Sequence, residues 1–474
     1  MIMLFTIALR NLQRNLRRSV VTIMAIALGG LAILTFAGFM SYIVVGFRTT
    51  SAIEPNGHLA VMRTGLFTVG AGNPAAYGIA GYARVIKTIE DDPTLGPMIN
   101  VITPTINMLG LAANFDADSS RTFFGLGVVP SDREKMRAWD ESGITRNRKL
   151  EPSGLVDDDP QRGVIGTGLA RILGLCQQLN LPNCAAPPQQ QPQPPAPAGA
   201  PSAPAANDFA DLVSRDLGDA PASPDSAMPR IDLLAATSGG SPNVVSLYVA
   251  KTQTQGAREL DDAFVSMNLA LAQQLMYGRA EPQVTSIVIQ LHHTADLGAA
   301  RHRLLALFKE KGLDLEVHDY TELTPMYNQV IGFFGAIFVF IAVVMGVIVL
   351  FTVINTMTMS VMERTNEIGT TRALGVRRSG IRRQFLAEGS LLGVIGAVLG
   401  LVLTEIVGVT LNHVGLRWTP PGESYAIPLR MLLTEIRPLM AAVTAVLIVI
   451  AVIAALIPAN RAARMPVVDS LRHA

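Results

Sequence analysis

Three stretches of the chain contain no charged residue and are long enough to cross a membrane. They are residues 19–47, 329–362 and 438–460, and each exceeds the roughly 20 apolar residues that span a hydrocarbon core about 30 Å thick. A fourth apolar stretch, residues 384–411, is interrupted by Glu405 but keeps the length of a span. The sequence therefore predicts four transmembrane helices.

The composition predicts one large domain outside the membrane. Of the 474 residues, 49% are hydrophobic and 16% are charged, which is too apolar for an ordinary soluble enzyme and too polar for a chain made only of membrane helices. Residues 48–328, between the first two spans, are the one segment that can hold such a domain. A net charge of +1 excludes the strongly basic surface of a dedicated nucleic-acid binder, so no nucleic-acid partner is expected.

Arginines in the short flanking segments set the expected orientation. Residues 1–18 hold four arginines and no acid, residues 363–388 hold six arginines and three glutamates, and residues 461–474 hold three arginines and one aspartate. Because short basic segments stay in the cytoplasm, both termini and residues 363–388 are predicted there. The predicted order is a cytoplasmic segment 1–18, helix 19–47, external domain 48–328, helix 329–362 with a stalk, cytoplasmic segment 363–388, helix 384–411, external loop 412–437, helix 438–460 and cytoplasmic tail 461–474.

The external domain holds both cysteines, Cys176 and Cys184. At this spacing and in an oxidising compartment they are predicted to form a disulfide, with two free thiols or a metal site as the alternatives. Residues 185–207, which follow, are rich in proline and glutamine and have no apolar periodicity, so they predict a disordered linker whose role the sequence does not indicate.

The rest of this domain has mixed α/β character. Residues 57–65 and 285–291 have the short apolar runs of strands, and residues 296–312 have apolar residues at helical spacing followed by Gly312. Alternation resumes after Gly312, so residues 284–320 predict a β-α-β unit.

Motifs of catalysis are missing from the sequence. It contains no G-x-x-x-x-G-K-[ST], no H-E-x-x-H and no G-x-S-x-G, so no catalytic residue, no cofactor and no metal site is predicted. His292 and His293 are interpreted as a surface pair at a strand end, and Asp157–Asp159 as a solvated turn, in preference to metal ligands.

The charged segment between the second and third spans is punctuated by glycines. Gly369 is expected to end one helix, the following TTRAL to form about one helical turn, and Gly375 to end that turn. A helix then restarts with Ile381 and Phe385 on one face. The segment would be an elbow that presents three residues to a cytoplasmic partner: Arg372, Ala373 and Leu374.

The same segment carries an extended family signature. The pattern E-x-x-x-E-I-G-x-x-R-A-L-G-V at residues 363–376, then I-x-x-x-F-L-x-E-G at residues 381–389, resembles that of the MacB/FtsX-type ABC transporter permeases, which include lipoprotein-releasing and macrolide-exporting systems. Residues 458–472 resemble the C-terminal tail of that family. FFGLGVVPSDRE, VIGTGLARILGL and ELDDAFVSMNLALAQQL resemble pieces of its periplasmic domain, so the resemblance covers most of the chain except residues 185–207.

The resemblance implies a fold and a set of partners. The fold would be four transmembrane α-helices with a large α/β periplasmic domain inserted between helix 1 and helix 2, in the bacterial inner membrane. ATP would be bound and hydrolysed by a separate ABC ATPase subunit, so the chain itself would be no enzyme and hold no cofactor. Further partners would be a second permease copy or a paralogue, membrane lipids, and a periplasmic adaptor or lipoprotein carrier.

The implied mechanism is mechanical: closure of the ATPase subunits would push the elbow and move the second helix, releasing a lipoprotein, lipid or amphiphilic compound. The residues implied in contact or coupling with the ATPase are Glu363, Glu367, Ile368, Gly369, Arg372, Ala373, Leu374, Gly375, Arg377 and Arg378.

Several alternatives stay open. Arg377 and Arg378 could bind anionic lipid headgroups instead of the ATPase, and Gly393, Gly396 and Gly400 could be either static helix-packing residues or a moving seam. The chain could also be a non-transporting regulator that relays the state of the ATPase to a periplasmic enzyme, or a sensor of antimicrobial compounds. Cargo and the choice between homodimer and heterodimer are not encoded in any recognisable motif.

Overall fold

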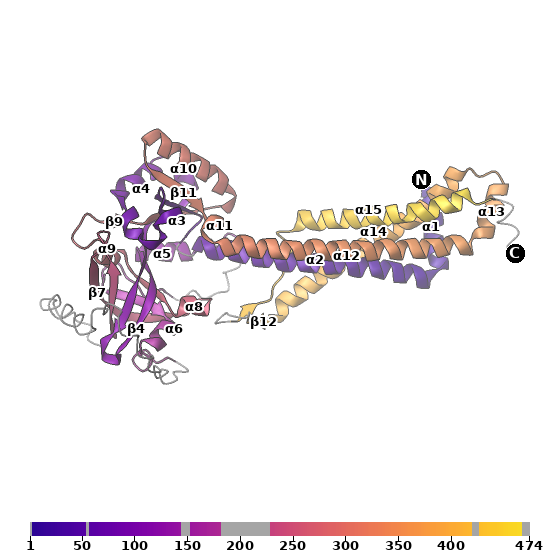
Figure 1. Ribbon diagram of the computed structural model, residues 1–474. Coiled ribbons are helices and arrows are strands. Elements are labelled where there is room, and N and C mark those ends of the chain that lie inside the picture. The colour runs from indigo at the N-terminus through magenta and orange to yellow at the C-terminus, as the bar shows by residue number, and fades with distance from the viewer. Residues whose placement is uncertain (1, 54–55, 144–151, 182–227, 420–425, 467–474) are drawn as a thin grey trace, which may run out of the picture. The chain divides into compact units, whose positions relative to one another are not determined.

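The computed structural model describes residues 2–53, 56–143, 152–181, 228–419 and 426–466 (Figure 1). The chain divides into two compact units. We call one the helical unit, which comprises Met1–Gly46, Met326–Trp418 and Ile427–Ala474. The other, the sheet unit, comprises Phe47–Pro325 and Thr419–Ala426.

Long apolar helices dominate the helical unit. Its elements are α1 (Ile2–Arg14), α2 (Leu16–Ile53, which extends into the sheet unit), α12 (Pro325–Glu363), α13 (Thr365–Ala373), α14 (Arg378–Val414), β12 (Arg417–Trp418), β13 (Ile427–Pro428) and α15 (Arg437–Arg464). Four of them, α2, α12, α14 and α15, are long and apolar enough to cross a membrane. The prediction of four membrane helices flanking an α/β domain is confirmed, and each helix is longer than its apolar stretch because polar residues extend both of its ends.

Residues 1–18, predicted only as a charged cytoplasmic segment, contain a helix. Helix α1 ends at Arg14 and α2 begins at Leu16. Ala8 and Leu12 of α1 are buried in the same apolar cluster as Phe385 of α14. Helix α1 is therefore part of the packed helical unit, and it lies at the same end as α13 and the C-terminal end of α15 (Figure 1).

The sheet unit is built on a nine-stranded sheet of order β11-β1-β10-β3-β4-β8-β5-β7-β6. Its strands are β1 (Leu59–Arg63), β2 (Ile79–Ala80), β3 (Ile99–Asn114), β4 (Ser119–Val128), β5 (Arg162–Gly166), β6 (Arg230–Ala236), β7 (Pro242–Gln253), β8 (Phe264–Asn268), β9 (Gln283–Val284), β10 (Ser286–Leu291) and β11 (Leu315–Asp319). Its helices are α3 (Leu66–Val69), α4 (Tyr82–Glu90), α5 (Pro130–Arg137), α6 (Thr167–Ile172), α8 (Arg258–Asp261), α9 (Leu269–Tyr277), α10 (Leu297–Lys311) and α11 (Tyr320–Leu323).

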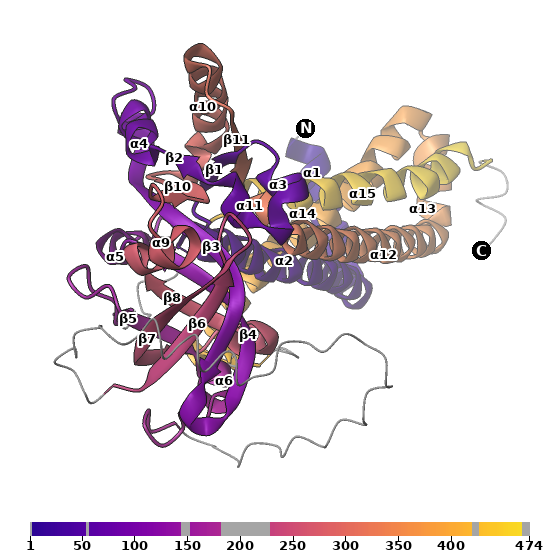
Figure 2. The ribbon, with the colours of Figure 1, turned by 60° about the vertical axis from the view of Figure 1, so that its left-hand side comes forward.

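The sheet closes on itself through its longest strand. The first part of β3 pairs with β10, and its second part pairs with β4 on one side and with β6 on the other. Strands β3, β4, β8, β5, β7 and β6 therefore form a ring (Figure 2). Closure needs a glycine at position 110, because a Cβ there would lie 2.2 Å from the carbonyl oxygen of Leu234. The sequence did not predict this ring.

The predicted β-α-β unit is confirmed at the other end of the sheet. Strand β10, helix α10 and strand β11 follow one another along the chain, and β1 lies between the two strands, antiparallel to both. Helix α10 ends where predicted, because Gly312 adopts φ +63° at its C-cap. All six residues of β10 are buried, as expected for a strand covered on both faces.

The polar surface features have the expected positions. His292 and His293 are both exposed, and residues 157–158 form a turn. Across the ranges that the structure describes, no group of three or more His, Cys, Asp or Glu side chains is arranged to hold a metal ion.

Cys184 and the proline- and glutamine-rich residues 185–207 lie outside the described residues. The Cys176–Cys184 disulfide and the disordered linker therefore stay predictions.

Candidate coupling site

The first part of the charged segment forms helix α13 after a short break in the chain, and its second part, from Arg378, is the beginning of α14. Helix α12 ends at Glu363, Arg364 adopts φ −110° and ψ 18°, and α13 begins at Thr365. The prediction that Gly369 ends a helix is wrong. A glycine ends a helix when it adopts a positive φ, and Gly369 does not; it is buried beside Ile368 within α13.

Gly375 ends α13 as predicted. Its φ is +97°, its N–H donates to the carbonyl of Arg372 at 3.0 Å, and the N–H of Val376 donates to the carbonyl of Thr371 at 3.3 Å. This pair of hydrogen bonds defines a Schellman motif, which a glycine in the left-handed region favours. The turn fixes the direction of the chain between α13 and α14.

Residues 374–377, which we call the coupling loop, are exposed. Leu374 is 82% exposed and Val376 39%, and Ala373, Arg377 and Arg378 are exposed too. Leu374 lies outside the helices that are apolar enough to cross a membrane. An exposed leucine on a rigid turn, flanked by arginines, is the type of feature that a partner protein covers.

A buried ion pair lies at the start of α13. Arg364 Nη1 donates to Glu388 Oε1 of α14 at 2.8 Å, and each side chain is only 3% exposed. Arg364 Nη2 also donates to the carbonyl of Asn11 in α1 at 3.2 Å, and Asn11 Nδ2 donates to Glu388 Oε1. Removing two charges from water is costly unless they are paired and hydrogen-bonded; these contacts pair the charges and bond both terminal nitrogens of Arg364, while its buried Nε has no hydrogen-bond partner among the described residues. We call Asn11, Arg364 and Glu388 the polar joint.

Two predicted coupling residues, Glu363 and Glu367, face the N-terminal helices. Glu363 accepts hydrogen bonds from Asn15 and Arg18, and Glu367 pairs with Arg14 at 2.6 Å, with both side chains 55% exposed. Exposed pairs of this kind contribute about 0–1 kcal/mol, so they align the helices weakly compared with the polar joint.

The other end of α13 is also attached. The guanidinium of Arg372 donates to the carbonyl of Met465, immediately after α15. Helix α13 is thus held at its beginning, through buried Ile368 and Gly369, and near its end, while the coupling loop beyond it is exposed.

The predicted packing glycines lie at close helix contacts. A Cβ on Gly393 would be 2.7 Å from Ala451 Cβ of α15, one on Gly396 would be 2.7 Å from Ile26 Cβ of α2, and one on Gly400 would be 2.8 Å from the carbonyl oxygen of Ala27. Small residues let membrane helices approach closely, and here one helix, α14, packs on two neighbours through them.

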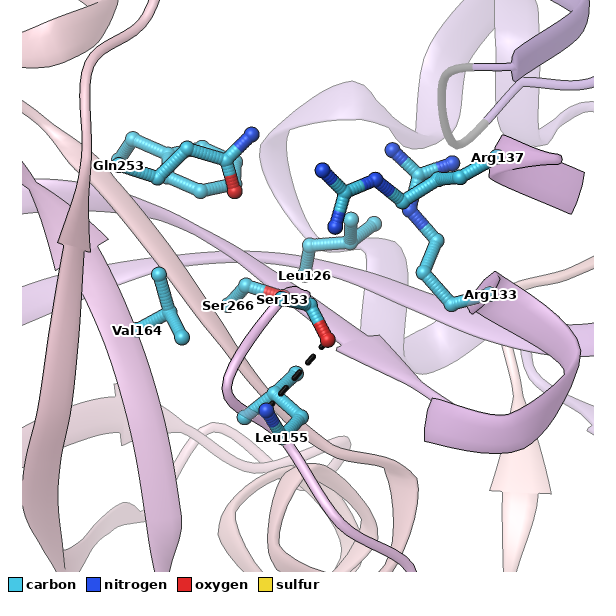
Figure 3. Close-up of a pocket in the computed structure, with 9 residues that line it drawn as sticks. Leu126, Arg133, Arg137, Ser153, Leu155, Val164, Gln253 and Ser266 are labelled. Carbon is cyan, nitrogen blue, oxygen red and sulfur yellow. Dashed lines mark hydrogen bonds between the residues drawn. The ribbon is translucent and has the colours of Figure 1, made fainter. Parts of the chain in front are cut away.

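The sheet unit contains a separate hollow of about 370 Å³, part of which is open to solvent. Figure 3 shows Arg133 and Arg137 on one side of it. Arg133 donates to the carbonyl of Ile53, and Arg137 pairs with Glu134 at 3.4 Å. Because both guanidinium groups are occupied by protein acceptors, we assign no ligand to this hollow.

Sequence reasoning missed the polar joint. Arg364 lies inside the family signature but not among the predicted coupling residues, and Asn11 lies in residues 1–18, whose arginines predict only a cytoplasmic location. The available signal was Glu388, an acidic residue at the edge of an apolar stretch, where an unpaired carboxylate would be costly. Its partners could not be identified because they are distant in the sequence.

Residues 338–467 match the family model described as FtsX-like permease C-terminal. This part of the chain is similar to the FtsX-like permease family. The match includes α13, the coupling loop and Glu388, and it confirms the resemblance to MacB/FtsX-type permeases.

Known relatives cover only part of the chain. It is 28% identical over 194 residues to a macrolide export ATP-binding/permease protein MacB of Rhodopirellula baltica, covering 41% of this chain and 24% of the relative. It is 31% identical over 170 residues to the pyoverdine export ATP-binding/permease protein PvdT of Pseudomonas entomophila, covering 35% and 25%. The matched part thus spans about a quarter of the length of these relatives.

Among solved structures, the chain is similar to the extracellular domain of the noncanonic ABC-type transporter YknZ from Gram-positive bacteria. The alignment covers 55% of this chain and 99% of that domain. The TM-score is 0.28 and the identity 9%, which is too low to establish a shared fold.

Proposed function

We propose that this FtsX-like permease is the membrane subunit of an ABC transporter whose ATP is hydrolysed by a separate subunit. ATP-driven movement of that subunit would push the coupling loop and, through α13, the membrane helices. The cargo would be a lipoprotein, lipid or amphiphilic compound exported or extracted from the inner membrane or periplasm. The permease would be multi-pass in the bacterial inner membrane, with both termini and the coupling loop in the cytoplasm and the sheet unit in the periplasm.

The observation that carries this proposal is the exposed Leu374 at the end of a firmly attached helix. Helix α13 is buried along Ile368 and Gly369 and hydrogen-bonded at Arg372, so a force applied at the coupling loop would be transmitted to the helical unit. The names of the relatives, which are ATP-binding and permease proteins of macrolide and pyoverdine export, support the transporter class.

The partner set would consist of the ABC ATPase subunit, a second permease copy or paralogue, membrane lipids, and an adaptor or lipoprotein carrier in the periplasm. ATP would bind on the partner subunit, so this chain would be the mechanical half of the transporter. The alternative, a regulator that relays the state of the ATPase to a periplasmic enzyme, would use the same coupling loop and differ only in what the sheet unit contacts.

A substitution at the tip of the coupling loop tests the proposal. Leu374→Asp should insert into the membrane and accumulate normally, because Leu374 is 82% exposed in the permease alone and exposed positions usually change stability by no more than about 0.5 kcal/mol. If the ATPase buries Leu374, the variant loses about 1.5–3 kcal/mol of apolar contact, which corresponds to roughly 10- to 150-fold weaker binding. The measurement is co-purification of a co-expressed ABC ATPase subunit and the ATP hydrolysis that the permease stimulates.

Thr370→Asp is the matched control, because it adds the same charge to an exposed position of α13 one turn earlier. It should weaken binding much less than Leu374→Asp. Full ATPase binding and stimulation by Leu374→Asp, or equal losses in both variants, would contradict a contact centred on Leu374.

A further inference from the structure

The polar joint connects three segments that the membrane spans alone would leave separate. Arg364 lies at the break between α12 and α13, Glu388 lies on the third turn of α14, and Asn11 lies on α1, more than 350 positions away from either along the chain. One guanidinium therefore contacts two other helices at once, through different nitrogens.

The burial of the joint makes these contacts specific. The side chains of Arg364 and Glu388 are each 3% exposed. If α13 moved away from α14, two charges would separate in surroundings that replace water poorly. The pair thus resists separation more strongly than the exposed Arg14–Glu367 pair, whose side chains are both 55% exposed.

The joint also lies at the correct place to act on the coupling loop. Helix α13 leads from Arg364 to Leu374, and α14 leads from Arg378 back to Glu388, so the pair closes the base of a hairpin whose tip is the coupling loop. Asn11 then fixes α1 to the same base by donating to Glu388 and accepting from Arg364.

We propose that Arg364 and Glu388 are positioning residues that make α1, α13 and α14 move as one body when the coupling loop is pushed. This inference rests on the proposed function for the push, whereas the rigidity of the joint can be measured without any ATPase. Without the Arg364–Glu388 pair, the coupling loop would still bind its partner, but its displacement would not be transmitted from α13 to α1 and α14.

The geometry predicts different effects for two substitutions. Arg364→Lys keeps the charge and can pair with Glu388, but an ammonium cannot reproduce the planar fork that reaches Glu388 and the Asn11 carbonyl together. It should loosen α1 from the break between α12 and α13, while Asn11 still donates to Glu388 and α13 stays paired with α14. Glu388→Gln keeps an acceptor oxygen but removes the negative charge that faces buried Arg364, so it should weaken the attachment of both α13 and α1 to α14.

The experiment measures distances between spin labels on the full-length permease in lipid nanodiscs, with Cys176 and Cys184 replaced by serine. Labels on exposed positions of the three helices, Gln13, Thr370 and Arg383, report the α1–α13, α1–α14 and α13–α14 distances. Arg364→Lys should widen only the α1–α13 distribution, because the Asn11–Glu388 bond remains, and Glu388→Gln should widen the α1–α14 and α13–α14 distributions. Arg14→Gln, which breaks the exposed pair, is the matched control and should leave all three unchanged.

The second readout is coupling to a co-expressed ABC ATPase. Both joint variants should still co-purify with it and lose the stimulated hydrolysis. Unchanged distance distributions would overturn the joint, and so would wider distributions with full stimulation. If Glu388→Gln fails to accumulate, the label distances and the stimulated hydrolysis of Arg364→Lys test the proposal in its place. Full coupling by Leu374→Asp would refute the proposed function, while the label distances would still decide whether the joint holds the helices.

Discussion

Among the glycines of the described membrane helices, Gly389 of α14 leaves the least room for a side chain, and it faces Ala455 of α15. A Cβ on Gly389 would lie 2.3 Å from Ala455 Cβ, and the next nearest atom would be 3.7 Å away. Ordinary contacts between carbon atoms are about 3.5–4.0 Å, so Gly389→Ala forces the two helices apart by more than about 1 Å. Such overpacking costs about 1–3 kcal/mol, partly offset by the higher helix propensity of alanine, about 1 kcal/mol.

Because one methyl group causes the clash, removing its counterpart should relieve it. Gly389→Ala should lower the Tm of the detergent-solubilised protein by several degrees, at about 2–4 °C per kcal/mol for a unit of this size. Ala455→Gly alone should also destabilise, by about 1 kcal/mol. The double variant Gly389→Ala/Ala455→Gly should recover most of the stability, giving a coupling energy of at least about 1 kcal/mol.

Gly335→Ala on α12 is the matched control, because nothing lies within 4 Å of the added Cβ. It should be neutral or slightly stabilising. If Gly389→Ala unfolds at the same temperature as Gly335→Ala, or if the destabilisations of Gly389→Ala and Ala455→Gly simply add, the two residues do not clash as predicted.

Three further predictions concern the sheet unit and the orientation. Burial lowers the pKa of the His58 imidazole from 6.5 to about 4, so the unfolded state binds a proton at a higher pH than the folded state does. The free energy of unfolding should therefore fall by up to about 3 kcal/mol as the pH drops from 6.5 to 4. Urea unfolding of wild type should show this pH dependence and that of His58→Gln should lack it; parallel pH profiles of the two proteins would contradict the prediction. A cysteine at Ser379 should react only after the inner membrane is permeabilised and one at Ser202 in intact spheroplasts; the reverse pattern would invert the topology. Denatured, unreduced protein should show no free thiol if Cys176 and Cys184 are bonded, and two reactive thiols would exclude the disulfide.

Local properties of the sequence were sufficient to predict the membrane helices and the C-terminal end of α13. The apolar length of residues 329–362 predicts a span whatever its neighbours are, since the bilayer acts on each stretch by its composition. Gly375 likewise ends α13 through its own φ and two hydrogen bonds to the preceding turn. The prediction for Gly369 was wrong because glycine has two roles in helices. In the left-handed region it ends a helix, and inside a helix it permits close packing against a neighbour. Only the surroundings of the residue distinguish these two roles.

The tertiary structure alone decided which distant residues meet. The β3–β6 pairing that closes the strand ring joins Leu111 to Leu234, and the polar joint brings Asn11 to Arg364 and Glu388. Neither contact leaves a periodic signal, because each depends on how separate segments fold back on one another. A sequence can indicate that Glu388 needs a partner, since a buried carboxylate is costly unless it is paired, but which of the chain's arginines provides it is determined by the packing of the helices.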